Sequence, residues 1–257
     1  MDSRSVKPGH LFAALAGTKM HGAEFIPYAL RMKAGAVLTD PAGAEMAREA
    51  LAGTDIPVIV VEDARAALAG AAALWFGAQP QVMVAVTGTN GKTSVATFTR
   101  QIWTRLGHLA ANIGTTGVEG AFSAPATHTT PEPLTLHRLL AEMAAEGITH
   151  AAMEASSHGL EQRRLDGVRL RAAGFTNFTQ DHLDYHHDFD AYFAAKAGLF
   201  TRVLPDDGSA VVNMDDPKGV EIARLCHDRG LPVLGVGRGS ADLRITAQRF
   251  DATRLEL

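Results

Sequence analysis

The sequence predicts an α/β protein whose larger part is a P-loop-type, mostly parallel sheet with helices on both faces. Two observations support this prediction. From residue 81 onward, apolar segments of strand length alternate with helical segments, which is typical of parallel strands joined by crossover helices. The first of these strands leads directly into a glycine turn that carries a lysine and a threonine, as phosphate-binding loops do.

The amino-terminal part is expected to form a smaller α/β domain. Its short apolar segments are separated by Gly, Pro and Asp turns, and an alanine-rich helix is expected to close it. The predicted strands are residues 11–14, 36–39 and 58–61, and the helix is residues 64–76. The segment Gly77-Ala78-Gln79-Pro80 then interrupts the pattern. We therefore predict two domains, residues 1–78 and 79–257.

In the second part, the predicted strands are residues 81–86, 150–154, 172–177, 210–213 and 232–236. The predicted helices are residues 92–106, 134–146, 189–200 and 217–229. Because ligands gather at the carboxyl ends of parallel strands, we expect Asn90–Thr93, Glu154–His158 and Asn177–His182 to converge. Residues 243–257 alternate enough to predict one further strand. Its open edge indicates either that the sequence is a fragment or that a partner or a later domain covers the edge.

The composition is that of a soluble globular protein. The 257 residues are 46% hydrophobic, which is enough for a sizeable core. The net charge of −4 is spread along the chain, so the sequence indicates neither a nucleic-acid nor a membrane surface. The single cysteine, Cys226, excludes an internal disulfide, and the start lacks the apolar core of a signal peptide. A cytoplasmic location is expected.

The turn after the first strand of the second part is expected to bind phosphate. Gly88 and Gly91 allow backbone N–H groups to surround phosphate oxygens, Lys92 adds a positive charge, and Thr93 offers a hydroxyl to Mg²⁺. The expected cofactor-binding residues are Gly88, Thr89, Asn90, Gly91, Lys92, Thr93 and Ser94. The generic pattern has glycine where Val86 stands, and an ordinary glycine-rich turn is the alternative.

Two further features suggest a metal site. Glu154 ends a predicted strand, where a buried carboxylate requires a cation such as Mg²⁺; a surface salt bridge or a helix cap is the alternative. Acidic and imidazole side chains also cluster within seven residues: Asp181, His182, Asp184, His186 and His187. Three imidazoles would suit Zn²⁺, but beside a phosphate loop Mg²⁺ is favoured. His182 is the preferred ligand, whereas His186 and His187 are expected to be solvated.

Lys196 lies in an otherwise apolar helical segment, where the simplest interpretation is a side chain that extends to solvent. Hydroxyl, amide and guanidinium groups that suit a polar anionic substrate follow the predicted strand ends. They belong to Thr129, Thr130, Ser156, Gln162 and Arg164. Each of them, taken alone, is also an ordinary loop or helix-start residue.

Several strings together resemble the Mur ligase family. They are Thr87–Thr93, Thr129-Thr130-Pro131, Met153–Leu160, Thr176-Asn177 with Asp181–His186, and Ala195-Lys196. The Glu-x-Ser-Ser-His-Gly-Leu and Asp-His-Leu-Asp-Tyr-His strings resemble the branch that adds the third amino acid to UDP-N-acetylmuramoyl-L-alanyl-D-glutamate. The segment from Asp2 to Phe12 resembles the family's uridine-binding domain.

The resemblance implies an ATP-dependent amide ligase of peptidoglycan precursor synthesis. ATP would phosphorylate the D-glutamyl γ-carboxylate, and an amine would then displace the phosphate. By the same resemblance, Lys92 neutralises the transferring phosphoryl group, while Thr93, Glu154 and His182 hold Mg²⁺. Lys196 matches a lysine that CO₂ carboxylates, which would support a second Mg²⁺.

The resemblance also implies that Thr129, Thr130, Ser156, Gln162 and Arg164 bind the substrate and that Ser3 contacts the uridine. It leaves Asn177 unassigned and does not decide between meso-diaminopimelate and L-lysine. The expected partners are small molecules only, namely UDP-N-acetylmuramoyl-dipeptide, an amino acid and ATP, and the expected state is a monomer.

Two alternatives remain open at this point. One is another ligase of the same type, acting in folylpolyglutamate or cyanophycin synthesis. The other is a non-catalytic nucleotide- or UDP-muramoyl-peptide-binding fragment. The chain matches only part of the family pattern, since an incomplete central domain is expected and the adenine side and the carboxyl-terminal ligase domain are expected to be absent. The isolated chain is accordingly expected to be inactive.

Overall fold

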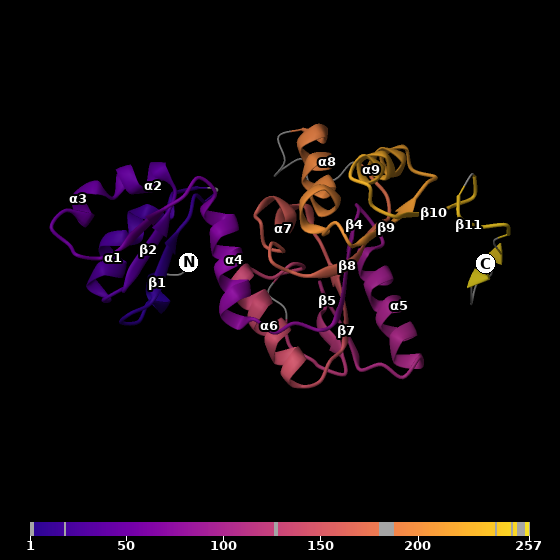
Figure 1. Cartoon of the computed structure of the whole chain (residues 1–257), viewed down its shortest axis with the longest axis horizontal. Helices are drawn as coiled ribbons and strands as arrows, with labels where there is room; N and C mark the ends of the chain where they lie inside the picture. Colours follow the sequence, from indigo (N-terminus) through magenta and orange to yellow (C-terminus); the bar gives the residue numbers. More distant parts are fainter. Residues whose placement is uncertain are drawn as a thin grey trace. The chain divides into compact units, whose positions relative to one another are not determined.

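The computed structural model describes residues 3–17, 19–125, 128–179, 188–239, 241–247, 249–250 and 255–256 (Figure 1). It divides into two compact units, Met1–Ala71 and Ala72–Leu257. The division falls within helix α4 (Ala64–Phe76), whereas the sequence analysis placed the domain boundary after this helix. The assignment of residues 1–78 and 79–257 to two domains stays a prediction. Within the described ranges, no helix is both long and apolar enough for a bilayer crossing.

The first unit is built on a parallel sheet of three strands in the order β1-β2-β3. The strands are β1 (Leu11–Ala14), β2 (Ala36–Thr39) and β3 (Val58–Val60). The helical segments are η1 (Ser3–Ser5), η2 (Gly22–Phe25), α1 (Ile26–Arg31), α2 (Pro41–Met46) and α3 (Arg48–Leu51). Phe12, Ile26 and Val37 are buried in its core. The predictions for residues 11–14, 36–39 and 64–76 are confirmed to the residue.

The second unit contains a sheet of eight strands in the order β11-β10-β9-β8-β4-β7-β5-β6 (Figure 1). All neighbouring strands are parallel except β5 and β6. The strands are β4 (Val82–Thr87), β5 (Ala110–Gly114), β6 (Gly117–Gly120), β7 (His150–Glu154), β8 (Leu170–Phe175), β9 (Ser209–Asn213), β10 (Val233–Gly237) and β11 (Leu243–Arg244). The mostly parallel sheet is confirmed, but the sequence analysis missed β5 and β6.

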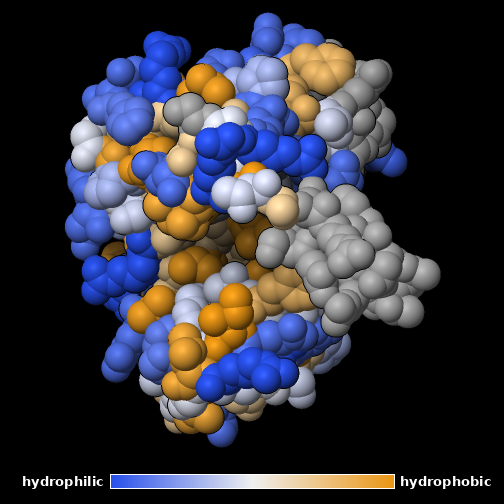
Figure 2. All heavy atoms as spheres, turned by 90° about the vertical axis from the view of Figure 1, so that its right-hand side faces the viewer, coloured by the Kyte–Doolittle hydropathy of each residue, from blue (hydrophilic) through white to orange (hydrophobic). Residues whose placement is uncertain are grey.

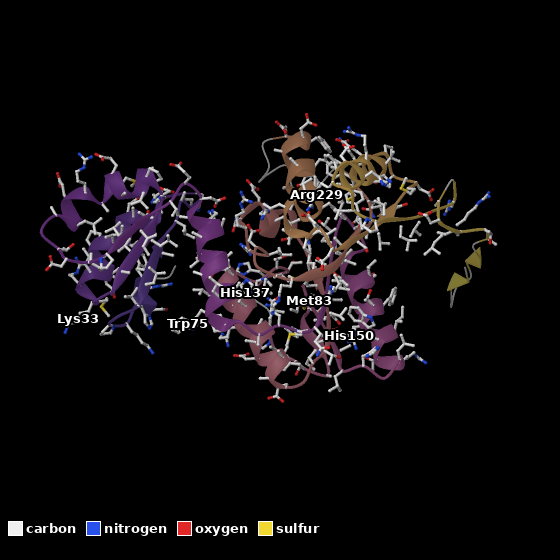
Figure 3. The ribbon with its side chains drawn as sticks, in the orientation of Figure 1. Lys33, Trp75, Met83, His137, His150 and Arg229 are labelled. Atoms are coloured by element: carbon white, nitrogen blue, oxygen red, sulfur yellow. The ribbon has the colours of Figure 1, made fainter. Side chains whose placement is uncertain are left out.

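Helices cover both faces of this sheet. They are α5 (Lys92–Arg105), α6 (Pro133–Ala145), α7 (Ser157–Glu161), α8 (Phe189–Gly198) with the π-helical turn η3 (Leu199–Val203), and α9 (Pro217–Asp228). On one face, Met83 packs in the main core with α6 residues such as Leu136 and Leu140 (Figure 3 labels Met83). On the other, Ala96 of α5 packs against Val86 and Ala152.

His137 of α6 is a polar side chain that lies buried beside this core. Its Nε2 lies 3.0 Å from the carbonyl oxygen of Asp166, and the side chain is buried (Figure 3 labels His137). Burial, with a smaller contribution from the charge of Arg169, lowers the pKa of His137 to about 4. The imidazole is therefore neutral at pH 7.

The exposed side of α5 carries an apolar stripe beside polar residues such as Gln101 and Arg105. Val95, Phe98, Ile102 and Leu106 follow one another at spacings of three and four residues, and all four are exposed. Figure 2 shows hydrophobic side chains at the surface on this side of the molecule. The periodicity thus predicts the helix correctly, but the small residue Ala96, rather than this stripe, meets the sheet.

The prediction of a single strand over residues 243–257 is wrong. The segment contains β11, followed by a separate antiparallel pair of β12 (Arg249–Phe250) and β13 (Leu255–Glu256). Leu243 in β11 is 55% exposed. Leu243 and Arg244, the two residues of β11, are both exposed, so this edge offers little burial that would extend the strand.

Candidate functional site

A cleft of about 560 Å³ lies at the carboxyl ends of the central strands. Asn90–Thr93 line it from the loop between β4 and α5, and Glu154 with Ser156–His158 line it from the end of β7. Lys196 reaches it from α8. Two of the three segments that the sequence predicted to converge therefore meet, as expected for parallel strands.

The turn between β4 and α5 depends on its two glycines. Gly88 has φ 142° and Gly91 has φ 86°, values that favour glycine. A Cβ atom on Gly88 would also collide with Oγ1 of Thr176. Gly91 caps α5, whose first turn begins with Lys92 and Thr93 at the cleft. The backbone N–H groups of a helix's first turn are the groups that bind phosphate in such loops.

Asn177, which the sequence left without a contact, holds this turn. Its Oδ1 accepts a hydrogen bond from the backbone N–H of Asn90 at 2.9 Å, and its Nδ2 donates to the carbonyl of Asn90 at 3.2 Å. Oγ1 of Thr176 donates to the same carbonyl at 2.6 Å, and the carbonyl of Asn177 accepts from N–H of Thr89 at 2.9 Å. Asn177 therefore positions the loop.

Glu154 is 2% exposed, and all its described partners are neutral donors. Oε1 accepts hydrogen bonds from Oγ1 of Thr93 and from N–H of Thr115, both at 2.9 Å. Gly114 leaves room for the carboxylate, since a Cβ there would overlap Oε1. Both alternatives raised for Glu154 are wrong, because the carboxylate is buried and Ser156 caps α7.

Two lysines share one backbone oxygen beneath the loop. Nζ of Lys92 donates to the carbonyls of Gly88 at 2.9 Å and Thr89 at 2.8 Å. Nζ of Lys196 donates to the same Gly88 carbonyl at 2.8 Å and lies 4.4 Å from the centre of the Tyr192 ring. Lys196 is 1% exposed, so the interpretation that it extends to solvent is wrong.

The predicted substrate residues form a hydrogen-bonded group around Thr130. Nη1 of Arg164 donates to the carbonyl of Thr130 at 2.7 Å, and Nη2 donates to Oε1 of Gln162 at 2.8 Å. Oγ of Ser156 lies 3.1 Å from Oγ1 of Thr130. Thr129 lies 3.0 Å, hydroxyl to hydroxyl, from Thr115 at the end of β5. Thr129, Thr130, Ser156 and Arg164 line the cleft directly.

The remaining predicted residues lie elsewhere. Ser94 is exposed in the first turn of α5, outside the cleft lining, and Ser3 is half-buried in η1 of the first unit. His182 lies outside the described residues, as do Asp181, Asp184, His186 and His187. Among the residues that are described, no three His, Cys, Asp or Glu side chains are grouped to hold a metal ion.

Four residues of the cleft had been given no role from the sequence, namely Thr115, His128, Ser157 and His158. Thr115 follows β5, which was not predicted. Ser157 was quoted within a motif but was given no role. A polar residue that follows a buried strand is the available signal, and it would have found Thr115 once β5 was recognised.

A parallel sheet with a phosphate-binding type of loop at its carboxyl edge defines a P-loop-type α/β protein. Residues 86–256 match the Mur ligase middle domain, and residues 1–76 match the model described as Mur ligase family, catalytic domain. The chain therefore belongs to the Mur ligase family.

Among its relatives are UDP-N-acetylmuramoyl-L-alanyl-D-glutamate–2,6-diaminopimelate ligases. That of Mesorhizobium japonicum is 52% identical over 242 residues, covering 92% of this chain and 48% of the relative. That of Brucella melitensis is 52% identical over 253 residues, covering 97% and 51%. The chain thus spans about half the length of the curated relatives it matches.

Solved structures agree with this fold. A ligase structure of the same name aligns with a TM-score of 0.83 at 30% identity, covering 99% of this chain and 51% of that one. A MurF ligase from Thermotoga maritima in complex with ADP aligns with a TM-score of 0.60 at 18% identity, covering 99% and 53%. The second likeness shows the fold alone.

Proposed function

We propose that this chain carries the ATP-binding and UDP-muramoyl-peptide-binding parts of an ATP-dependent amide ligase in peptidoglycan precursor synthesis. The ligase joins 2,6-diaminopimelate to UDP-N-acetylmuramoyl-L-alanyl-D-glutamate. The observation that carries the proposal is the buried carboxylate of Glu154, bonded to the Thr93 hydroxyl at the start of α5 beside Lys92. The choice of diaminopimelate over lysine follows the names of relatives at about 50% identity.

The donor set fits Mg²⁺. A buried carboxylate whose described partners are neutral favours a divalent cation, and a threonine hydroxyl adjoins it at 2.9 Å. Glu154 and Thr93 would hold the ion, with His182 as a further ligand. When bound, Mg²⁺ would neutralise negative charge on the phosphoryl oxygens and so favour transfer of the phosphoryl group.

The chain's own groups perform the remaining tasks. The loop Gly88–Ser94 binds the phosphates of ATP through its N–H groups, and Lys92 moves from the loop carbonyls onto the phosphoryl group. Thr129, Thr130, Ser156, Gln162 and Arg164 bind the muramoyl dipeptide and direct its γ-carboxylate toward the loop. Asn177 keeps the loop in the receiving conformation.

Lys196 is proposed to lose a proton and to react as the free amine with CO₂, forming an N–C bond to give a carbamate and releasing a second proton to solvent. A buried ammonium group at a cation site opposes a second metal ion, whereas a carbamate carries a negative charge and supports one.

The remaining proposals concern the first unit, the location of the enzyme and its oligomeric state. The first unit binds the uridine nucleotide with Ser3 as a contact, and the enzyme is a cytoplasmic monomer.

The test is ligation by the protein made from the complete reading frame. We expect phosphate release that requires ATP, Mg²⁺, the UDP-muramoyl dipeptide and diaminopimelate together. Lysine and dihydrofolate with glutamate serve as competing substrates. Release with the folate substrate would favour the folylpolyglutamate alternative. Binding of the nucleotides without any release would favour the non-catalytic module.

A further inference from the structure

Two adjacent serines at the start of α7 use their hydroxyls differently. Oγ of Ser156 accepts the N–H of Gly159 at 3.0 Å and so caps the helix. The Thr130 hydroxyl donates its single proton to the carbonyl of Glu154 at 3.0 Å. The contact of 3.1 Å between the hydroxyls of Thr130 and Ser156 must therefore be donated by Ser156. The Ser156 hydroxyl therefore already donates its one hydrogen bond within the protein.

The Ser157 hydroxyl is not committed. The residue is 1% exposed, and across the described part of the chain its Oγ has no hydrogen-bond partner. A buried hydroxyl without a partner loses its bonds to water and gains nothing in return. Ser157 nevertheless lines the cleft, unlike Thr87, the other described residue whose buried hydroxyl is unpaired. An unpaired buried donor at the wall of a binding cleft indicates a partner that arrives with the ligand.

The charges of the cleft define the chemistry of that partner. Lys92 and Arg164 line the same cleft, so an anion is favoured beside them. A hydroxyl can donate to an anionic oxygen, and such charge-assisted bonds are stronger than neutral ones. Helix α7, which begins with Ser157, packs on α8, which carries Lys196.

We propose that Ser157 is a ligand-binding residue whose hydroxyl donates a hydrogen bond to an anionic oxygen of the bound substrates, either a phosphoryl or a carboxylate oxygen. The inference rests on the proposed function. Ser157 then supplies a hydrogen-bond donor that Ser156 cannot supply, because the Ser156 hydroxyl already donates to Thr130.

The test compares Ser157→Ala with the matched control Thr87→Val in the protein from the complete reading frame. Each variant removes one unpaired buried hydroxyl, but only Ser157 lines the cleft. Denaturation without ligand measures the fold. Calorimetry with AMP-PNP and Mg²⁺, and separately with UDP-N-acetylmuramoyl-L-alanyl-D-glutamate, measures binding.

We expect both variants to be at least as stable as the wild type without ligand, because neither hydroxyl has a hydrogen-bond partner among the described residues. Ser157→Ala should bind one of the two ligands about ten- to a hundredfold more weakly, as the loss of a hydrogen bond to a charged group predicts. If Ser157→Ala binds AMP-PNP more weakly, the hydroxyl of Ser157 donates to a phosphoryl oxygen. If it binds the UDP-dipeptide more weakly, the hydroxyl donates to a carboxylate oxygen. Thr87→Val should bind both normally.

Two results would overturn the inference while the proposed function stands. One is wild-type affinity of Ser157→Ala for both ligands. The other is a loss of ligand-free stability in Ser157→Ala but not in Thr87→Val, which would show that the hydroxyl serves the fold. A wild type that binds neither ligand would instead overturn the proposed function, and this inference with it.

Discussion

Replacing Glu154 by glutamine separates the metal role of this carboxylate from its structural role. The amide keeps an oxygen that accepts from Thr93 and Thr115, whose two bonds measure 2.9 Å. Making the acceptor neutral weakens these bonds by about 2 kcal/mol in total. Removing the buried charge also removes its desolvation penalty of several kcal/mol, which stabilises the folded state. Without ligand, Glu154→Gln should therefore be as stable as the wild type, or more stable.

Metal binding should respond in the opposite direction. Two unit charges 4 Å apart interact by about 4 kcal/mol at an effective dielectric constant of about 20, and a divalent ion by more. Loss of the carboxylate should thus lower the Mg²⁺-dependent affinity for AMP-PNP more than about a hundredfold. Calorimetry with and without Mg²⁺ measures this change, and Glu146→Gln, an exposed change outside the cleft, is the control.

Glu154→Ala supplies the contrast. It leaves the Thr93 hydroxyl and the Thr115 N–H without their acceptor, at about 1–3 kcal/mol each, and it opens a cavity. It should unfold at lower denaturant concentration than Glu154→Gln. If Glu154→Gln keeps wild-type binding of AMP-PNP with Mg²⁺, the carboxylate is not a metal ligand and our reasoning is refuted.

Three further outcomes are expected. Lys92→Ala removes one donor from the carbonyls of Gly88 and Thr89 and should lower the unfolding midpoint slightly, but it should raise the activation free energy of phosphoryl transfer by on the order of several kcal/mol, and near-normal ADP release would contradict its role. Lys196→Ala should lose ligation and regain part of it with added small carboxylates; absence of rescue, together with a mass that shows only the free amine at alkaline pH under CO₂, would argue against carboxylation. Because the pKa of His137 is lowered to about 4, the unfolded chain binds its proton first as the pH falls, so stability should be full above about pH 6.5 and decline toward pH 4. His137→Gln should flatten that decline in urea titrations at pH 7 and pH 5, and an unchanged slope would exclude the assignment.

The sequence predicted elements whose signals are local. Strands β1, β2 and β7 and helix α4 have the predicted bounds, because apolar runs between turn residues mark them. Strand β5 was missed because its Ala-Ala-Asn-Ile-Gly sequence is low in β-branched residues and places Asn112 in the core. Arg100 of α5 makes that placement possible, since its Nε donates to Oδ1 of Asn112 at 2.6 Å. A partner on another element cannot be read from strand propensity.

The same distinction holds in the cleft. The glycines of the loop could be predicted from their own spacing, since only glycine suits the backbone of Gly88 and Gly91. The role of Asn177 depends on a contact with Asn90, 87 positions away in the sequence. The uncommitted proton of Ser157 depends on which hydroxyls the chain brings together, so it becomes apparent only in the folded structure.

The Gly88 carbonyl links the two lysines to the proposed chemistry. Lys92 and Lys196 both donate to it, which concentrates two positive charges beneath one loop. Like charges repel, and burial of Lys196 limits the screening by water. A carbamate on Lys196 would keep one N–H, so the bond to Gly88 can persist while its carboxylate faces the cleft. Carboxylation would thus remove the repulsion and leave the part-buried Lys92 as the cation that follows the phosphoryl group.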